Sequence, residues 1–145
     1  MKKNSLWVAV VLVVILLLSG CNKGPYELSQ SAENIVTIQL CRSKGEPGAY
    51  TYPEQVKVIR QLEEDEFDAF VQDICQLELH STTPPSYGFG TNIVVITYSD
   101  GSMDILSDHA VEYVLAGENN NQVCGLTFTR KEFNAVFSKY AEKDE

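Results

Sequence analysis

The sequence predicts an α+β domain: a mostly antiparallel sheet with two amphipathic helices packed on one face. Three observations predict this fold. Segments with strand periodicity outnumber those with helical periodicity, which are two. The turn Ser99-Asp100-Gly101-Ser102 joins two of the strand segments as a hairpin. A parallel α/β fold would instead need strands and helices to alternate regularly, so we expect an antiparallel sheet of about five to seven strands.

The first half of the chain supplies two strands and a short third one. Apolar and polar residues alternate over 36–41 and again over 56–62, which is the two-residue period of a strand. Residues 43–48 contain Gly45-Glu46-Pro47-Gly48 and are therefore expected to form a turn or loop. A short strand is expected at 77–80.

The second half supplies the centre of the sheet. Residues 93–98 are apolar at almost every position, as in a strand that is buried on both faces. The hairpin turn leads into its partner strand at 103–106. Two further strands are expected at 111–115 and 122–128, around the Gly117-Glu118-Asn119-Asn120-Asn121 turn.

Two helices are expected, each with one apolar face. Phe67, Phe70, Val71, Ile74 and Cys75 form a continuous stripe at helical spacing. The acidic residues 63–66 crowd the first turn of this helix, where the helix dipole favours negative charge. The second helix begins after Thr129, and its apolar face carries Phe133, Val136, Phe137 and Tyr140.

The two helices begin in matching sequences. Residues 62–67 match residues 128–133 position by position, with an apolar residue before the cap, a Glu at the third helical position and then a Phe. This pattern predicts a capping box in each helix. Thr129 with Glu132 is expected to be the better box, because Glu63 is a poorer cap than Thr. A duplicated unit would also explain the match, but two solutions to one capping problem are the preferred explanation.

The N-terminus has the layout of an export signal. Basic residues at Lys2 and Lys3 precede an apolar run from Leu6 to Leu18, which is followed by two small residues. The run has 13 residues, fewer than the roughly 20 that span a bilayer as a helix. The chain is therefore expected to be exported.

The sequence Leu18-Ser19-Gly20-Cys21 resembles the lipobox of bacterial lipoproteins. The resemblance implies cleavage between Gly20 and Cys21, a diacylglycerol on the Cys21 thiol, and a protein anchored by lipid to the extracytoplasmic face of the cell membrane. An ordinary cleaved signal peptide or an uncleaved membrane helix would leave the position of Cys21 unexplained. The predicted organisation is a signal peptide at 1–20, a lipidated tether at 21–31 and one globular domain at 32–145.

Charge and cysteine content narrow the function further. After residue 20 the chain has 20 acidic and 9 basic residues, a net charge of −11, which disfavours binding to nucleic acid and to anionic headgroups. The domain is therefore expected to stand off the membrane. Apart from Cys21, the chain has three cysteines, Cys41, Cys75 and Cys124. Because three is an odd number, at most one disulfide can form among them. With no Cys-x-x-Cys and only two histidines, His80 and His109, no metal site and no cofactor are expected.

The loop at 81–90 holds the candidate binding residues. Tyr87 and Phe89 lie among glycines, after two prolines that limit the freedom of the loop. Aromatic side chains on a stiffened loop supply contact area at low entropic cost. The alternative is that both rings fold back over the edge of the core.

No sequence motif for a known reaction is present, and no catalytic residue is assigned. The first hypothesis is therefore a non-enzymatic lipoprotein whose acidic domain binds a protein partner at the cell surface, as an inhibitor, an immunity-type protein or an assembly factor. An enzyme acting on envelope material through scattered side chains is the second hypothesis. A binder of glycans or small molecules through Tyr87 and Phe89 is the third.

Overall fold

The computed structural model describes residues 24–44, 56–81, 90–118 and 121–142. Its helical elements are two 3-10 turns and two α-helices, η1 (Ala32–Asn34), η2 (Glu64–Glu66), α2 (Phe67–Ile74) and α3 (Arg130–Ala141). Its strands are β1 (Ile35–Ser43), β2 (Val56–Gln61), β3 (Leu79–Ser81), β4 (Asn92–Tyr98), β5 (Met103–Ser107), β6 (Val111–Val114), β7 (Asn121–Val123) and β8 (Leu126–Phe128).

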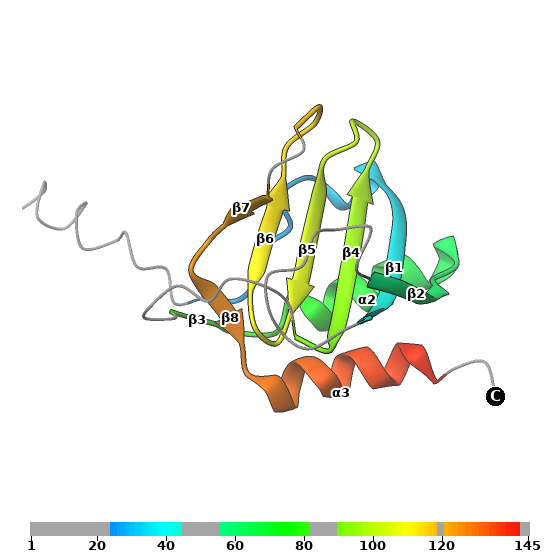
Figure 1. Cartoon of the computed structure of the whole chain (residues 1–145). Helices are drawn as coiled ribbons and strands as arrows, with labels where there is room; N and C mark the ends of the chain where they lie inside the picture. The colour runs from blue at the N-terminus through cyan, green and yellow to red at the C-terminus, as the bar shows by residue number, and fades with distance from the viewer. Residues whose placement is uncertain (1–23, 45–55, 82–89, 119–120, 143–145) are drawn as a thin grey trace, which may run out of the picture.

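The main sheet is antiparallel and has the strand order β2-β1-β4-β5-β6-β7, while β3 and β8 form a separate antiparallel pair (Figure 1). The predicted α+β class is confirmed. The hairpin between β4 and β5 is also confirmed, and Gly101 in its turn has a φ of 86°, a conformation that a side chain would make costly. Strand β4 lies in the interior of the sheet, as the apolar run at 93–98 predicts.

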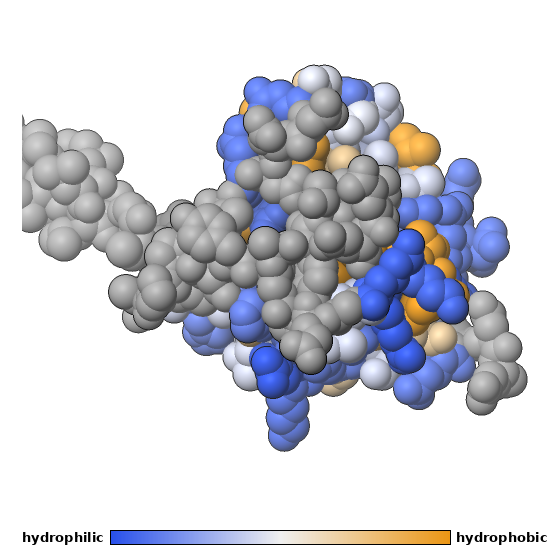
Figure 2. Space-filling view, viewed as in Figure 1, coloured by the Kyte–Doolittle hydropathy of each residue, from blue (hydrophilic) through white to orange (hydrophobic). Residues whose placement is uncertain are grey.

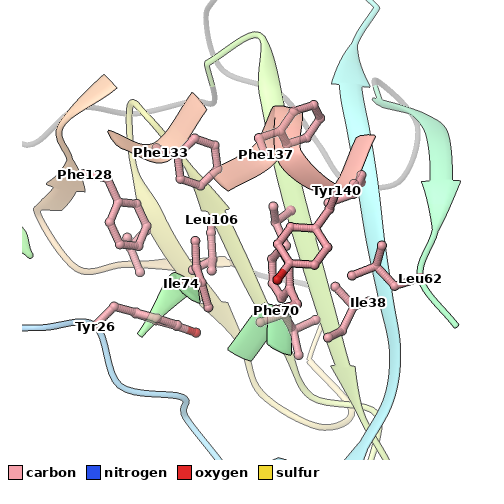
Figure 3. Close-up of a cluster of buried hydrophobic side chains, with 14 of the residues drawn as sticks. Tyr26, Ile38, Leu62, Phe70, Ile74, Leu106, Phe128, Phe133, Phe137 and Tyr140 are labelled. Atoms are coloured by element: carbon pink, nitrogen blue, oxygen red, sulfur yellow. The ribbon is translucent and has the colours of Figure 1, made fainter. Parts of the chain in front are cut away.

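Both α-helices pack on the same face of the sheet, as predicted. Helix α2 contributes Phe70 and Ile74, while α3 contributes Phe133, Phe137 and Tyr140. Figure 3 shows these side chains converging between the helices and the strands. The Phe70 and Tyr140 rings meet edge to face with their centroids 5.1 Å apart. This aromatic layer is the larger of the two apolar clusters.

The opposite face of the sheet is apolar as well. Its buried residues come entirely from strands, and they are Cys41, Val56, Ile93, Val95, Ile105 and Val114. Strands buried on both faces read as continuous apolar runs, which explains the pattern at 93–98. Among the described helices, none contributes to this second cluster.

The predicted strand at 122–128 is two strands in two sheets. Strand β7 ends the main sheet beside β6, and β8 pairs with β3. Gly125 lies between them with a φ of 65°, which turns the chain from one sheet to the other. The expectation of one continuous strand was wrong. Only a single residue of this segment, Gly125, marks the break in the sequence.

The prediction that the second helix has the better capping box is wrong. Glu63 and Glu66 form the reciprocal box at η2, whereas the Thr129 side chain makes no capping hydrogen bond. Arg60 holds Glu66 in position through a largely buried ion pair of 2.8 Å. The Thr129 hydroxyl instead lies 3.2 Å from Nε2 of His80. Partners distant in sequence therefore decide which box forms.

Residues 24–31, which we call the N-terminal strap, are part of the folded domain, although the sequence predicts a tether as far as residue 31. The Tyr26 N–H donates to the Leu77 carbonyl, and the Leu79 N–H donates to the Gly24 carbonyl, each at 2.9 Å. Pro25 forms an isolated antiparallel bridge with Glu78. Tyr26 is 1% exposed and belongs to the main core. The described domain therefore includes Gly24.

Candidate functional site

The three residues that the sequence singles out, Cys21, Tyr87 and Phe89, lie outside the described residues. The structure does describe both flanks of the aromatic loop. On one flank, Ser81 pairs with Leu126 in the small sheet. On the other flank, Gly90 packs against the Asp108 carboxylate so closely that a Cβ atom on Gly90 would lie 1.7 Å from Oδ1. Leu126 belongs to β8, which directly precedes α3, and Asp108 is hydrogen-bonded to Arg130, the first residue of α3. Both flanks of the loop therefore contact residues close to the start of α3.

A hollow of about 210 Å³ lies beside the start of α3. It is lined by Gly90, Thr91, Asp108, His109, Arg130 and Asn134. The Arg130 Nε donates to Asp108 Oδ2 at 2.7 Å. The Asp108 side chain is 7% exposed and that of Arg130 is 73% exposed. One partner of this ion pair is therefore fixed in the protein, while the other reaches into solvent.

The polar groups of the hollow are only partly satisfied within the protein. Asp108 Oδ1 is buried and has no hydrogen-bond partner among the residues that the structure describes. The Asn134 Oδ1 accepts a hydrogen bond of 2.9 Å from the Asn92 side-chain amide. This hydrogen bond fixes the orientation of the Asn134 side chain. An unpaired buried acceptor is costly, so the hollow carries a polar atom that the fold alone does not explain.

The start of α3 carries cations where the helix dipole favours acids. Arg130 and Lys131 open this helix, whereas the first turn that leads into α2 is acidic. Positive charge at a helix N-terminus is unfavourable by a few tenths of a kcal/mol or more. Both histidines of the chain are near this point, since His80 lies beside Thr129 and His109 lines the hollow.

A second polar centre lies on the helix-facing side of the sheet, around Asp104. This residue is in β5, opposite Ile96 of β4 and Tyr113 of β6, and it is fully buried. Its Oδ2 accepts hydrogen bonds from the Tyr26 hydroxyl at 2.5 Å and the Tyr98 hydroxyl at 2.6 Å. Ser29 donates to the same carboxylate through its N–H, at 3.0 Å, and through its hydroxyl. The Asp104 carboxylate thus fastens the strap to the sheet.

The phenols of this network are held in their neutral form. Burial and the neighbouring Asp104 carboxylate raise the pKa of Tyr26 well above its ordinary value. Burial also raises the pKa of Tyr98, and its hydrogen bond to Asp104 acts in the same direction. Neutral phenols are hydrogen-bond donors. The network is therefore a set of donors around one acceptor, which suits a structural fastening better than acid–base chemistry.

The three described cysteines are free thiols. Burial raises the pKa of Cys41 to about 12 and also raises the pKa values of Cys75 and Cys124. Because the thiolate is the reactive form, none of these environments activates a cysteine nucleophile. Within the described ranges, no three His, Cys, Asp or Glu side chains are grouped so that they would hold a metal ion.

In the coloured part of the face shown in Figure 2, hydrophilic residues predominate and the apolar areas are separate from one another. Among the residues that the structure describes, the exposed large apolar side chains are Val36, Val58, Ile59 and Leu115. In the part of the chain that the structure describes, no helix is long and apolar enough to cross a membrane. The polar hollow is therefore the better-formed candidate site.

No protein-family model, curated protein or solved structure matches this chain. Sequence reasoning missed both the hollow and the Asp104 network. The available signals were a single acid within the apolar segment 103–106 and two cations at a helix start. Each is weak alone, because its meaning depends on a partner far away in the chain.

Proposed function

We propose that the protein is a lipoprotein anchored through Cys21, and that its acidic domain is a non-enzymatic protein-binding module held directly at the membrane surface. The lipobox resemblance at 18–21 supports the anchor, and the fastened strap supports a position of the domain close to the membrane. A free tether of residues 21–31 would let the domain move more than about 30 Å from its lipid, at up to about 3.6 Å per residue. With the strap fixed from Gly24 on, the three residues from Cys21 to Gly24 can span at most about 11 Å even when fully extended.

A short link has a direct consequence for binding. The domain meets partners that are themselves in or near the membrane, and its lipid holds it at high local concentration beside them. Its net charge of −11 repels an anionic surface, but this repulsion is screened beyond about 8 Å at physiological ionic strength. The lipid thus keeps the domain close, while the charge discourages the rest of its surface from lying flat on the bilayer.

The chemistry of the described residues supports binding more than catalysis. The buried Asp104 has its hydrogen-bonding capacity occupied by Tyr26, Tyr98 and Ser29. The cysteine pKa values are raised rather than lowered. An enzyme acting on the envelope finds less support, because the side-chain hydrogen bonds of the described hollow join Arg130 to Asp108 and Asn92 to Asn134, which are not nucleophile–base pairs.

A second candidate is a glycan or small-molecule binder that uses Tyr87 and Phe89. One observation favours it: both flanks of the aromatic loop are fastened near the start of α3, next to the hollow. Replacing Tyr87 and Phe89 with Ala separates this candidate from the first. Loss of binding to a glycan array with little change in stability would favour it.

Anchoring is tested by metabolic labelling with a fatty acid in a bacterial host. Wild-type protein should take up the label and lose residues 1–20, and Cys21→Ser should stay unlabelled and uncleaved. Cys124→Ser is the matched control, because it removes an exposed thiol and should leave labelling unchanged. Label that persists in Cys21→Ser would overturn the anchor, and a wild-type protein that is recovered without label would do the same.

A further inference from the structure

The cations at the start of α3 are not explained by helix stability. The matching entry into α2 has Glu64 and Asp65 at the positions that Arg130 and Lys131 occupy in α3. Acids at these positions stabilise a helix and cations do not. Of the two cations, Arg130 lines the hollow and is ion-paired with a buried carboxylate, whereas Lys131 is exposed and does not line it.

Arg130 is held in a geometry that leaves most of its guanidinium available. Its Nε donates a hydrogen bond to Asp108 Oδ2, and the two terminal nitrogens have no hydrogen-bond partner among the described residues. Because the side chain is 73% exposed, these nitrogens are accessible from solvent. A guanidinium that is fixed on one edge presents its other edge as a planar pair of donors, which matches a carboxylate.

We propose that this hollow binds the C-terminal carboxylate of a peptide chain, with Arg130 as the principal contact. The inference rests on the proposed function and gives that binding module a ligand chemistry. A monoanion is favoured over a phosphate dianion, because the Asp108 carboxylate lines the same hollow. The His109 ring and the Asn134 amide line the hollow as further polar partners.

The Asp108 side chain favours the C-terminus of a peptide, rather than a simple carboxylate such as acetate, as the ligand of the hollow. Its side chain is more than nine-tenths buried, and Oδ1 lacks a donor. The last residue of a peptide carries a backbone N–H next to its carboxylate, so it supplies the acceptor for Arg130 and the donor for Asp108 together. Gly90 lies against Oδ1, which is fully buried, so this second contact requires Gly90 to move away from Oδ1.

The test uses the full chain in detergent micelles and follows the arginine Nε–H signals by NMR. The probes are an N-acetylated Gly-Ala-Ala peptide with a free C-terminus, the same peptide amidated, acetate, and inorganic phosphate. A saturable shift of the Arg130 signal is expected with the free-acid peptide and not with the amide. Acetate should bind more weakly, because it lacks the donor for Asp108.

Variants separate a specific contact from general charge. Arg130→Gln should weaken binding of the free-acid peptide about 10- to 100-fold, as expected for loss of a charge-assisted pair. Arg130→Lys should retain only part of the affinity, because it loses the planar pair of donors. Lys131→Gln removes the same charge from the neighbouring residue and should leave binding unchanged.

Several results would overturn the inference: equal shifts with the free-acid and amidated peptides, tighter binding of phosphate than of the peptide, or equal losses in Arg130→Gln and Lys131→Gln. A folded wild-type protein that shows no saturable shift with any probe would also overturn it. The proposed function fails separately, through the fatty-acid label on Cys21. A protein that is labelled but binds no carboxylate loses the ligand assignment alone.

Discussion

Replacing Asp104 with Ala should destabilise the domain strongly and free its N-terminal strap. The carboxylate is fully buried and accepts hydrogen bonds from Tyr26, Tyr98 and Ser29. In the variant, the two buried phenols lose their acceptor. Ser29 is near enough to the surface for its two donors to bond to water.

The magnitude follows from the donors that are left unpaired. Each buried hydroxyl without an acceptor costs about 1–3 kcal/mol, and the variant is relieved of burying a carboxylate. We therefore expect a loss of about 2–4 kcal/mol in the free energy of unfolding. Tyr26→Phe removes one donor of the same network and should cost about 1.5–3 kcal/mol.

The assay is urea denaturation of the full chain in detergent, followed by circular dichroism. Glu27→Ala is the matched control, because it removes an acid from the exposed side of the same strap and should change stability by no more than about 0.5 kcal/mol. A loss below about 1 kcal/mol for Asp104→Ala would refute the reasoning, since the phenols would then have found other acceptors.

Three further predictions concern pH, thiols and the close contact at Gly90. The Tyr26 and Tyr98 pKa values are raised in the folded state, so their contribution to stability is complete below the unfolded pKa of about 10 and is lost progressively as pH rises from there to the folded values. Denaturation curves between pH 8 and 11 should show the onset of this loss, and Tyr26→Phe should reduce it. Brief maleimide treatment at pH 8 should modify the exposed Cys124 first and the buried Cys41 only on unfolding, which mass spectrometry of the peptides would check; rapid labelling of Cys41 in the folded protein would contradict it. Gly90→Ala places a Cβ 1.7 Å from Asp108 Oδ1 and should cost about 1–3 kcal/mol in urea denaturation, whereas Gly24→Ala meets nothing within 4 Å and should be nearly neutral; equal effects would refute the contact.

Much of the fold follows from local patterns in the sequence. Apolar alternation predicts β1, and the apolar run at 93–98 predicts β4, because burial on one or both faces leaves its period in the sequence. Helical periodicity likewise predicts the buried faces of α2 and α3. These features depend on residues within a few positions of one another.

The features that the sequence did not predict depend on distant partners. The strap reads as a polar tether, because the burial of Tyr26 depends on Asp104, which is 78 positions away. The capping boxes reverse because His80, which is 49 positions from Thr129, lies against its hydroxyl. The hollow likewise forms where Gly90, Asp108 and Arg130 meet, and the sequence pattern does not place these three residues together.

The fastening of the strap is tested most directly by amide hydrogen exchange at Tyr26 and Leu79. Their N–H groups form the two backbone hydrogen bonds that join the strap to residues 77–79. In the full chain, both amides should exchange slowly, close to the rates of amides in β4, and Asp104→Ala should speed the exchange of Tyr26 well before the core unfolds. Exchange of Tyr26 and Leu79 at the rate of a free peptide in the wild-type protein would contradict the account, because residues 24–31 would then be a loose tether.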